Sequence, residues 1–313
     1  DNIYPSGLPA EGRAGRDEAM RRLDDQIDAA RGAGAKVVFV PGNHDWRGKG
    51  AEGRESLKRQ QQRIEQRGAP DATHLPKDGC PGPEIVEVGA HLRLVALDTQ
   101  WWLQPHTGDD APAATCASGS EEEVIASLRG ALRVEGRDVV VITHHPPLSG
   151  GPHGGSFGLR QHLFPLTDSV SWLWLPLPGI GSAYPLLRQA GAFSQDISSG
   201  SYTRMRNAIA SAFRERPPLA WAAGHEHVLQ VIEDSRFGRV LVSGAGVYDH
   251  TSRVKDVRGS RFRSSRSGYM RIDLFADGRR RLAVIEVAKD ATTREAFTSD
   301  LVATTLPGLP ARP

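Results

Sequence analysis

Three apolar segments of the chain end in clusters of imidazole, amide and carboxylate side chains. The segments are residues 36–40, 137–143 and 219–224, and the clusters that follow them are Asn43-His44-Asp45, His144-His145 and His225-Glu226-His227. Ligands of open α/β sheets bind beyond the carboxyl ends of the strands, so side chains at these positions are well placed for chemistry. The chain also opens with a polar turn, Asp1-Asn2-Ile3-Tyr4-Pro5. We predict that the four loops meet at one edge of one sheet.

The residue types in these loops suit a metal ion. Hard and borderline cations bind neutral imidazole, carboxylate and amide oxygen ligands held on rigid elements. A lone His-x-His pair, such as His225 and His227, is more often structural than metal-binding. Its presence together with a Gly-Asn-His-Asp and a Thr-His-His-Pro motif, each at the end of an apolar run, favours a metal site. The candidate ligands are Asp1, Asn43, His144, His225 and His227.

At these positions the chain resembles the calcineurin-like metallophosphoesterases, and among them the purple acid phosphatases of the tartrate-resistant type. The family's motifs occur in order as Asp1-Asn2-Ile3-Tyr4, Gly42-Asn43-His44-Asp45, Val141-Ile142-Thr143-His144 and Gly224-His225-Glu226-His227, with Val242-Ser243-Gly244-Ala245-Gly246 after them. The resemblance covers residues 1 to about 250. It implies an α/β fold, namely a two-sheet sandwich of mixed strands with flanking helices, in four α/β/β/α layers.

The resemblance also implies a binuclear metal centre, with divalent or mixed-valence ions: iron together with zinc, manganese or a second iron. Asp1 would bridge the two ions. Asn43, His144 and His225 would hold one of them and His227 the other. Tyr4 occupies the position of a tyrosinate ligand to ferric iron. A tyrosine packed beside the site is the alternative, because a phenol loses its proton near pH 7 only beside a strongly acidic ion.

Three further residues would act on the substrate. The resemblance implies that His44 faces the substrate, that Asp45 orients His44, and that His153, in the glycine-rich loop 149–155, is a second substrate-side histidine. Attack by a metal-activated hydroxide would release an alkoxide, which His44 would protonate with support from His153. His145 would lie next to the metal ligands without binding a metal itself. The remaining histidines, His74, His91, His106, His162 and His250, lie in no motif and are predicted to be surface or structural.

The function implied is hydrolysis of phosphate monoesters, with a phosphorylated small molecule or other phosphoester as substrate. Two alternatives stay open: a phosphodiesterase or nucleotide hydrolase of the same family, and a non-catalytic, membrane-associated binding module on this fold. The family's first metal-binding motif, an Asp at a strand end well before Asp1, is missing together with its strand. We therefore expect either a trimmed chain or an incomplete site, and favour trimming.

Composition excludes some partners. The 313 residues are 39% hydrophobic and 24% charged, as in soluble globular proteins. With 39 basic and 37 acidic residues the formal charge is +2, so there is no global field to recruit nucleic acid, and we expect no specific binding to it. An excess of Arg over Lys, with abundant Ala and Gly, is associated with bacterial genomes of high GC content. The oligomeric state is left open.

Two cysteines bear on the compartment. Cys80 and Cys116 lie in Gly- and Pro-rich surroundings without the spacing of a metal site. A loop-closing disulfide and two thiols are both compatible with the sequence. A bridge would indicate an oxidising compartment, periplasmic or extracellular, with the cytoplasm as the alternative.

Periodicity predicts the elements and one domain. Helices are expected at 16–31, 54–66, 121–134 and 202–213, a hairpin at 84–88 and 92–97, and an antiparallel set of strands at 229–232, 240–243, 269–274 and 282–287. The domain would span 1–290, with a tail at 291–313 and an apolar insertion at about 148–200. The insertion would pack on the sheet, or form a lid that touches an apolar substrate or, through 163–187, a membrane surface.

Overall fold

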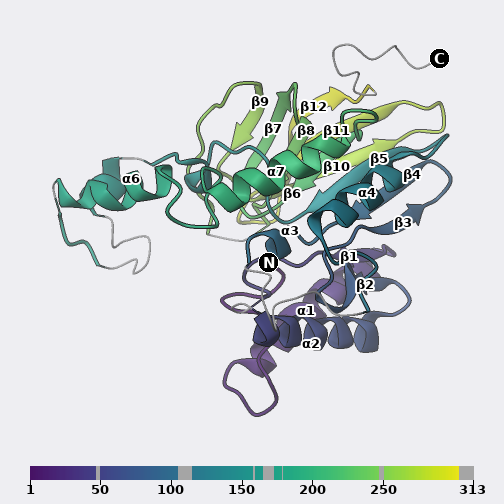
Figure 1. The fold of residues 1–313 in the computed structure, drawn as a ribbon, viewed down its shortest axis with the longest axis horizontal. Coiled ribbons are helices and arrows are strands. Elements are labelled where there is room, and N and C mark those ends of the chain that lie inside the picture. Colours follow the sequence, from purple (N-terminus) through teal and green to yellow (C-terminus); the bar gives the residue numbers. More distant parts are fainter. Residues whose placement is uncertain are drawn as a thin grey trace. The chain divides into compact units, whose positions relative to one another are not determined.

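The computed structural model describes residues 1–46, 50–104, 115–157, 159–164, 173–177, 179–246 and 250–302 (Figure 1). The chain divides into two compact units. Unit 1 comprises Asp1–His145 and Ser211–Trp221, and unit 2 comprises Pro146–Ala210 and Ala222–Pro313. The single domain predicted for 1–290 is thus built as two units. The prediction for His106 lies outside the described residues, as do parts of the insertion and of the tail.

Unit 1 holds most of the α/β part of the chain. Its elements are α1 (Arg16–Gly32), β1 (Val37–Phe39), α2 (Gly50–Gly68), β2 (Ala72–His74), the short helix Lys77–Gly79, β3 (Glu84–Val88), β4 (Leu92–Ala96), α3 (Thr99–Trp102), α4 (Glu121–Leu132) and β5 (Asp138–Thr143). The helix α7 (Gly200–Ala212) ends in this unit and β6 (Ala220–Ala223) begins in it.

Unit 2 holds the inserted segment and the antiparallel strands. Its elements are the short helices Pro152–Gly154 and Ile180–Ser182, α5 (Leu159–Leu163), α6 (Ala183–Gln189), most of α7, β7 (Leu229–Asp234), β8 (Gly238–Ser243), β9 (Ser260–Ser264), β10 (Gly268–Leu274), β11 (Arg280–Val287) and β12 (Thr293–Asp300).

The mixed α/β class is confirmed. The largest sheet has seven strands in the order β3-β4-β5-β6-β8-β7-β9. Helices precede and follow several of these strands in the sequence. The sheet is mixed, because β3 runs antiparallel to β4, β4 parallel to β5, and β7 antiparallel to both β8 and β9. This arrangement is consistent with the predicted metallophosphoesterase-like sandwich.

One expectation about the sheet is wrong. The strand before Asn43 was expected to share one sheet with the other site strands, but among the described residues β1 pairs only with β2, in a separate two-stranded parallel sheet. The backbone groups at both ends of β1 bond to the residues that flank β2. Val37 N–H donates to Asp71 O at 2.8 Å, and Leu75 N–H donates to Phe39 O at 2.8 Å. The short strand β2, which was not predicted from the sequence, is therefore the pairing partner of β1.

The core of unit 1 follows the predicted helix pattern. Ala19, Leu23 and Ile27, spaced every four residues on α1, are all at most 5% exposed. They form one apolar cluster with Phe39 of β1 and Ile64 of α2, together with Ile3, Leu8 and Ala72. This packing holds the polar turn at residues 1–4 and the strand before Asn43 on one rigid base.

The later strands form the expected antiparallel set, with additions. β10, β11 and β12 make a three-stranded antiparallel sheet, so residues 293–300 of the predicted tail are a strand. β9 lies within a basic segment and exposes the side chains of Arg261 and Arg263, which are 62% and 45% exposed. The exposed arginines of this segment therefore lie on the outer face of a strand.

Two further features concern the chain's environment. Cys80 and Cys116 are joined by a disulfide. Among the helices of the described ranges, none combines the length and apolarity needed to cross a bilayer.

Candidate metal centre and active site

The carboxyl end of β5 presents two buried imidazoles. His144 is 5% exposed and His145 is 0% exposed. Their backbone is held by Thr143, whose hydroxyl accepts a hydrogen bond from Trp221 Nε1 at 2.8 Å and donates one to the carbonyl of His145 at 3.0 Å. β5 therefore ends in a fixed turn, and both rings have defined positions.

Four predicted ligands of unit 1 converge around His144. Its Nε2 lies 2.9 Å from Asn43 Oδ1 and 3.1 Å from Asp1 Oδ2. Tyr4 donates its hydroxyl proton to the same oxygen, Asp1 Oδ2, at 3.0 Å. The other oxygen, Asp1 Oδ1, accepts the backbone N–H of His44 at 2.8 Å. An imidazole nitrogen, an amide oxygen, a carboxylate and a phenol thus face one small volume.

Gly42 makes this close approach possible. A Cβ atom at position 42 would lie 2.2 Å from Asp1 Oδ1 and 2.7 Å from His144 Cε1, far inside contact distance. Only glycine leaves room for the carboxylate and the imidazole at the turn after β1. The set also fits a metal chemically. Asn43 Oδ1 and the Asp1 carboxylate oxygens can accept hydrogen bonds but cannot donate them, so a proton or a cation must lie between these oxygens and His144 Nε2.

Asp45 has a different partner from the one predicted. It is 0% exposed, and its carboxylate accepts the backbone N–H groups of Asn2 at 2.9 Å, Ile3 at 3.1 Å and Gly42 at 2.9 Å. It therefore ties the turn at residues 1–4 to the turn after β1, and does not orient His44. Its effect on the site is to hold Asp1 and Asn43 in fixed positions relative to each other.

His44 is oriented by a carbonyl group instead. Its Nδ1 lies 2.6 Å from the carbonyl oxygen of Pro5, and its ring is 4.4 Å from that of Tyr4, centroid to centroid. A carbonyl oxygen only accepts, so Nδ1 carries the proton and the lone pair of the neutral ring is on Nε2. Burial raises the pKa of Tyr4 above its ordinary value, so its phenol is protonated unless a strongly acidic ion binds it.

His145 has a partner that sequence reasoning missed. Thr99, at the start of α3, places its hydroxyl 2.8 Å from His145 Nδ1, and the same hydroxyl accepts the backbone N–H of His145 at 3.1 Å. α3 is itself fixed by Asp98, whose carboxylate accepts the N–H groups of Gln100 and Trp101. The polar Asp98-Thr99 pair directly after the hairpin strand was the sequence signal.

In unit 2, His225 and His227 follow β6. His225 is 7% exposed and has a left-handed φ of 63°, an unusual backbone conformation for a residue other than glycine. Its Nε2 lies 3.3 Å from Gln195 O, and His227 Nδ1 lies 2.9 Å from His250 O. These carbonyl partners put the lone pair of each neutral ring on the opposite nitrogen, Nδ1 of His225 and Nε2 of His227, as a metal ligand requires.

The substrate-side histidine of unit 2 is held by an ion pair. His153 Nδ1 lies 3.1 Å from Asp196 Oδ1 and 2.8 Å from Arg188 Nη2, and its ring is 4.1 Å from the ring of His225. Asp196 is 1% exposed and bonds the Arg188 guanidinium through both carboxylate oxygens. Burial would raise the pKa of Asp196, but the hydrogen bonds from His153 and Arg188 hold that pKa below its ordinary value. Neither Asp196 nor Arg188 lies in a motif from which its role could have been predicted.

Glu226, between the two histidines, packs under the glycine-rich loop. It is 1% exposed and accepts the N–H of Gly154 at 3.1 Å. A Cβ atom at Gly151 would lie 2.4 Å from Glu226 Oε2, so the loop can close over the carboxylate only with glycine there. Burial raises the pKa of Glu226. The glycines of this loop therefore serve close packing, and they fix His153.

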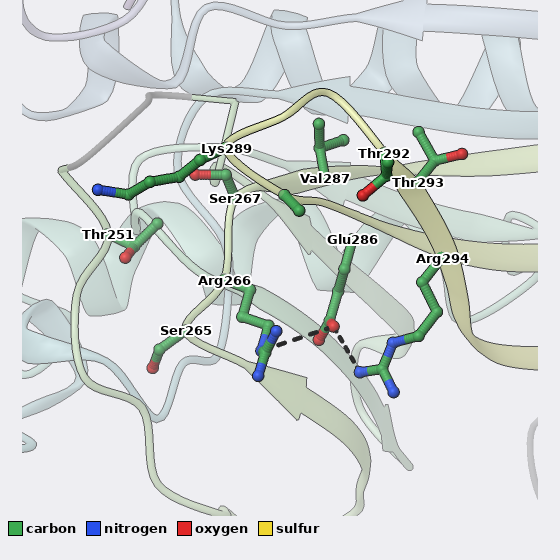
Figure 2. A pocket seen from close by; sticks show the side chains of 11 residues that line it. Thr251, Ser265, Arg266, Ser267, Glu286, Val287, Lys289, Thr292, Thr293 and Arg294 are labelled. Carbon is green, nitrogen blue, oxygen red and sulfur yellow. Dashed lines mark hydrogen bonds and ion pairs between the residues drawn. The ribbon is translucent and has the colours of Figure 1, made fainter.

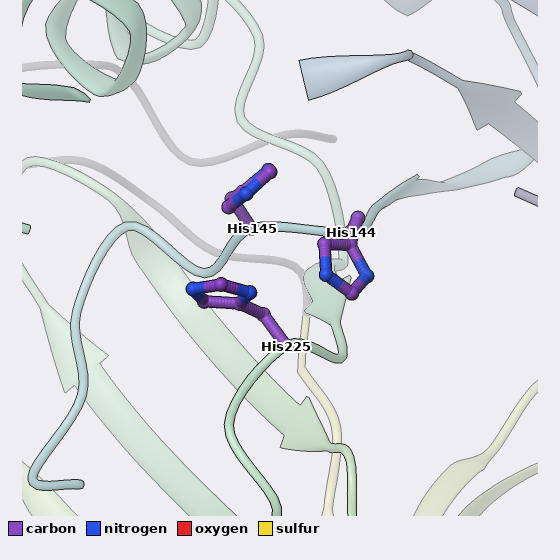
Figure 3. Close-up of side chains that lie close together, drawn as sticks. All are labelled: His144, His145 and His225. Atoms are coloured by element: carbon purple, nitrogen blue, oxygen red, sulfur yellow. The ribbon is translucent and has the colours of Figure 1, made fainter. Parts of the chain in front are cut away.

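Figure 3 shows the imidazoles of His144 and His145 after β5 and of His225 after β6. Their residue type and burial make all three candidate metal ligands. The predicted site residues are divided between the units: Asp1, Tyr4, Asn43, His44, Asp45 and His144 belong to unit 1, and His153, His225 and His227 to unit 2. Within unit 1 these residues are brought together, and within unit 2 the rings of His153 and His225 are 4.1 Å apart.

No family model and no curated protein matches the chain. Among solved structures, it is similar to "GAP50 the anchor in the inner membrane complex of Plasmodium", with 15% identity over 96% of this chain and 76% of that one, and a TM-score of 0.49. It is also similar to the purple acid phosphatase PPD1 from seeds of yellow lupin (Lupinus luteus), with 12% identity over 69% of this chain and 32% of that one, and a TM-score of 0.40. Both TM-scores are below 0.5, so nothing about the activity or partners of these proteins is carried over to this chain.

Proposed function

We propose that the protein is a binuclear metal-dependent phosphoesterase that hydrolyses phosphate monoesters. The observation that carries the proposal is the convergence of Asp1, Asn43 and His144, whose acceptor and ligand atoms lie 2.9 to 3.1 Å apart with Tyr4 beside them. Groups of this kind repel one another unless a cation or a proton lies between them.

We propose that the ligand sets of the two units hold a pair of metal ions, iron with zinc, manganese or a second iron. Asp1, Asn43 and His144 of unit 1 would act with His225 and His227 of unit 2, and Tyr4 would bind ferric iron. Bound cations of this kind polarise a phosphate group and make hydroxide available near neutral pH. The carbonyl partners of His225 and His227 support this role, since they fix the tautomer of each ring.

His44 and His153 are the groups proposed to act on the substrate. His44, as the imidazolium, would donate a proton from Nε2 to the leaving oxygen while its Nδ1–H stays bonded to the Pro5 carbonyl. His153, held by Asp196 and Arg188, is positioned to bind a phosphate oxygen or to support that proton transfer. Asp45 acts indirectly, because it holds the turns that carry Asp1 and Asn43.

The compartment is part of the proposal. A disulfide such as Cys80–Cys116 persists where the surroundings are oxidising. This supports a periplasmic or extracellular location over the cytoplasm.

Hydrolysis of 4-nitrophenyl phosphate, measured with and without a chelator, tests the function. We expect metal-dependent turnover, and a loss of kcat/KM of about a hundredfold or more in Asn43→Ala, because an amide ligand is removed. Asn207→Ala, on the exposed face of α7, is the matched control and should retain wild-type activity. A folded protein without metal-dependent turnover would contradict the proposal and favour the non-catalytic binding module.

A further inference from the structure

A groove of about 500 Å³ lies in unit 2 beside the turn that joins β11 to β12 (Figure 2). Its walls come from the β9–β10 connection, from the β11–β12 turn with the start of β12, and from Thr251. The turn is tight: Ala288 N–H donates to Thr292 O at 2.9 Å, and Ala291 has a φ of 63°. This local geometry places Lys289 at the groove.

The charges in the groove are mostly positive. Lys289, Arg266 and Arg294 line it with one carboxylate, Glu286, so three positive charges and one negative give +2. Arg294 lies opposite Glu286 in the β11–β12 register and donates to its Oε2 at 2.6 Å, while Arg266 Nε lies 3.8 Å from the same oxygen. Ser264 donates to the other oxygen at 2.6 Å. Glu286 thus anchors both guanidinium groups.

The arginines keep capacity for a ligand. Glu286 is 9% exposed, whereas Arg266 and Arg294 are 73% and 69% exposed, so the carboxylate lies beneath and the guanidinium groups lie at the solvent edge. Each guanidinium has five N–H donors, and one carboxylate cannot take them all. Planar N–H forks with a neighbouring ammonium suit a phosphate group.

The groove adjoins the loop that positions His227. The carbonyl of His250 accepts from His227 Nδ1 at 2.9 Å, and the N–H of Ser252 donates to the carbonyl of His227 at 2.9 Å. Thr251, between these two residues, lines the groove. The groove is therefore next to a ligand-bearing turn within the same unit.

We propose that this groove binds a second phosphate group of the substrate, so that small molecules with two phosphates are preferred over those with one. The inference rests on the proposed phosphoesterase function. A second phosphate group is an anionic group that such a substrate can carry besides the ester being cleaved, and two guanidinium groups with an ammonium suit it. Lys289, Arg266 and Arg294 would neutralise the second one and hold the substrate beside His227.

Phosphate release from fructose 1,6-bisphosphate and from fructose 6-phosphate tests the proposal with a matched pair of substrates. We expect the wild-type kcat/KM to be about tenfold higher for the bisphosphate, and the preference to vanish in the double variant Arg266→Gln, Lys289→Gln. Its activity on fructose 6-phosphate should stay within about twofold of wild type, because the groove is outside the proposed catalytic centre. Arg279→Gln, an exposed arginine paired with Asp277, is the control and should keep the preference.

Equal kcat/KM values for the two substrates in the wild type, or an unchanged preference in the double variant, would overturn the proposal. If neither substrate nor 4-nitrophenyl phosphate is hydrolysed, the phosphoesterase function itself fails, and calorimetric binding of fructose 1,6-bisphosphate then tests the groove alone. A Kd about tenfold weaker in the double variant than in wild type and Arg279→Gln would keep the groove as a phosphate site. Equal Kd values in the double variant and in wild type would show that the groove is not a phosphate site.

Discussion

Three histidines of the proposed centre, His44, His225 and His227, each place one ring nitrogen against a backbone carbonyl oxygen. The partners are Pro5, Gln195 and His250, none of which belongs to a recognisable motif. A carbonyl group cannot donate, so each contact selects one tautomer and directs the opposite nitrogen to its task. The histidines were readable from the sequence, but their carbonyl partners were not, because a carbonyl has no residue identity and is placed by loop conformation alone.

Tyr4→Phe separates the two interpretations of Tyr4. Its hydroxyl bonds Asp1 Oδ2, and burial raises its pKa, so a ferric ion is needed to remove the proton near pH 7. If Tyr4 is a ligand, the iron-loaded protein should show a visible phenolate-to-iron absorption band that is lost in Tyr4→Phe. A band of equal intensity in Tyr4→Phe would leave Tyr4 as a residue packed beside the site.

Asp196→Asn tests the positioning of His153. The substitution keeps the shape of the side chain but weakens its hold on His153 and Arg188, so kcat/KM for 4-nitrophenyl phosphate should fall roughly tenfold while metal content stays at the wild-type level. Asp24→Asn breaks another partly buried ion pair, with Arg63, and serves as the control for lost stability. Wild-type kinetics in Asp196→Asn would show that the ion pair does not serve catalysis.

Among the elements of unit 1, the β1–α2–β2 segment contains a buried titratable group. His74, at the end of β2, is 1% exposed, and burial lowers its pKa to about 4. In the unfolded chain its pKa is about 6.5. Between these values the unfolded chain binds a proton that the folded chain does not, so the free energy of unfolding falls as pH decreases from about 6.5 to 4, by about 3 kcal/mol.

Urea unfolding of wild type and His74→Leu at pH 7 and pH 4.5 measures this contribution. We expect wild type to lose about 2.5 kcal/mol more than His74→Leu over that interval. His91→Leu, in the exposed β3–β4 turn, should behave as wild type. Equal losses in all three proteins would show that His74 is protonated in the folded state.

Long periodic segments were predictable and short ones were not. The pattern of Ala19, Leu23 and Ile27 located α1, and the two hairpin strands were predicted within one residue of the bounds of β3 and β4. β2 has only three residues, too few to show a period, and without it the separate pairing of β1 could not be foreseen. β12 reads Thr-Arg-Glu-Ala-Phe-Thr-Ser-Asp, an exposed edge strand whose polar composition is typical of a tail.

At the scale of the whole molecule, the inserted segment exposes apolar side chains. Trp174, Leu186, Leu187 and Phe193 are 55%, 57%, 53% and 46% exposed. Part of the range 163–187, for which we predicted contact with a membrane surface, lies outside the described residues. Membrane contact stays our proposal, supported by these exposed aliphatic and aromatic groups.

Sedimentation with phosphatidylcholine vesicles tests the membrane proposal. We expect the wild type to bind and the double variant Leu186→Ser, Leu187→Ser to bind about tenfold more weakly, since each change removes buried apolar area on the bilayer. Ile85→Ser, an exposed apolar residue of β3 that is 45% exposed, is the matched control. Absence of wild-type binding would refute the membrane proposal.

The proposed ligands belong to both units, and we propose that each chain holds two metal ions. Its most direct test is the metal content per chain, by mass spectrometry, of protein supplied with iron, zinc and manganese. We predict two ions per chain in the wild type and in Asn207→Ala, and a clear loss in Asn43→Ala. One ion or none in the folded wild-type protein, or an unchanged content in Asn43→Ala, would contradict the account.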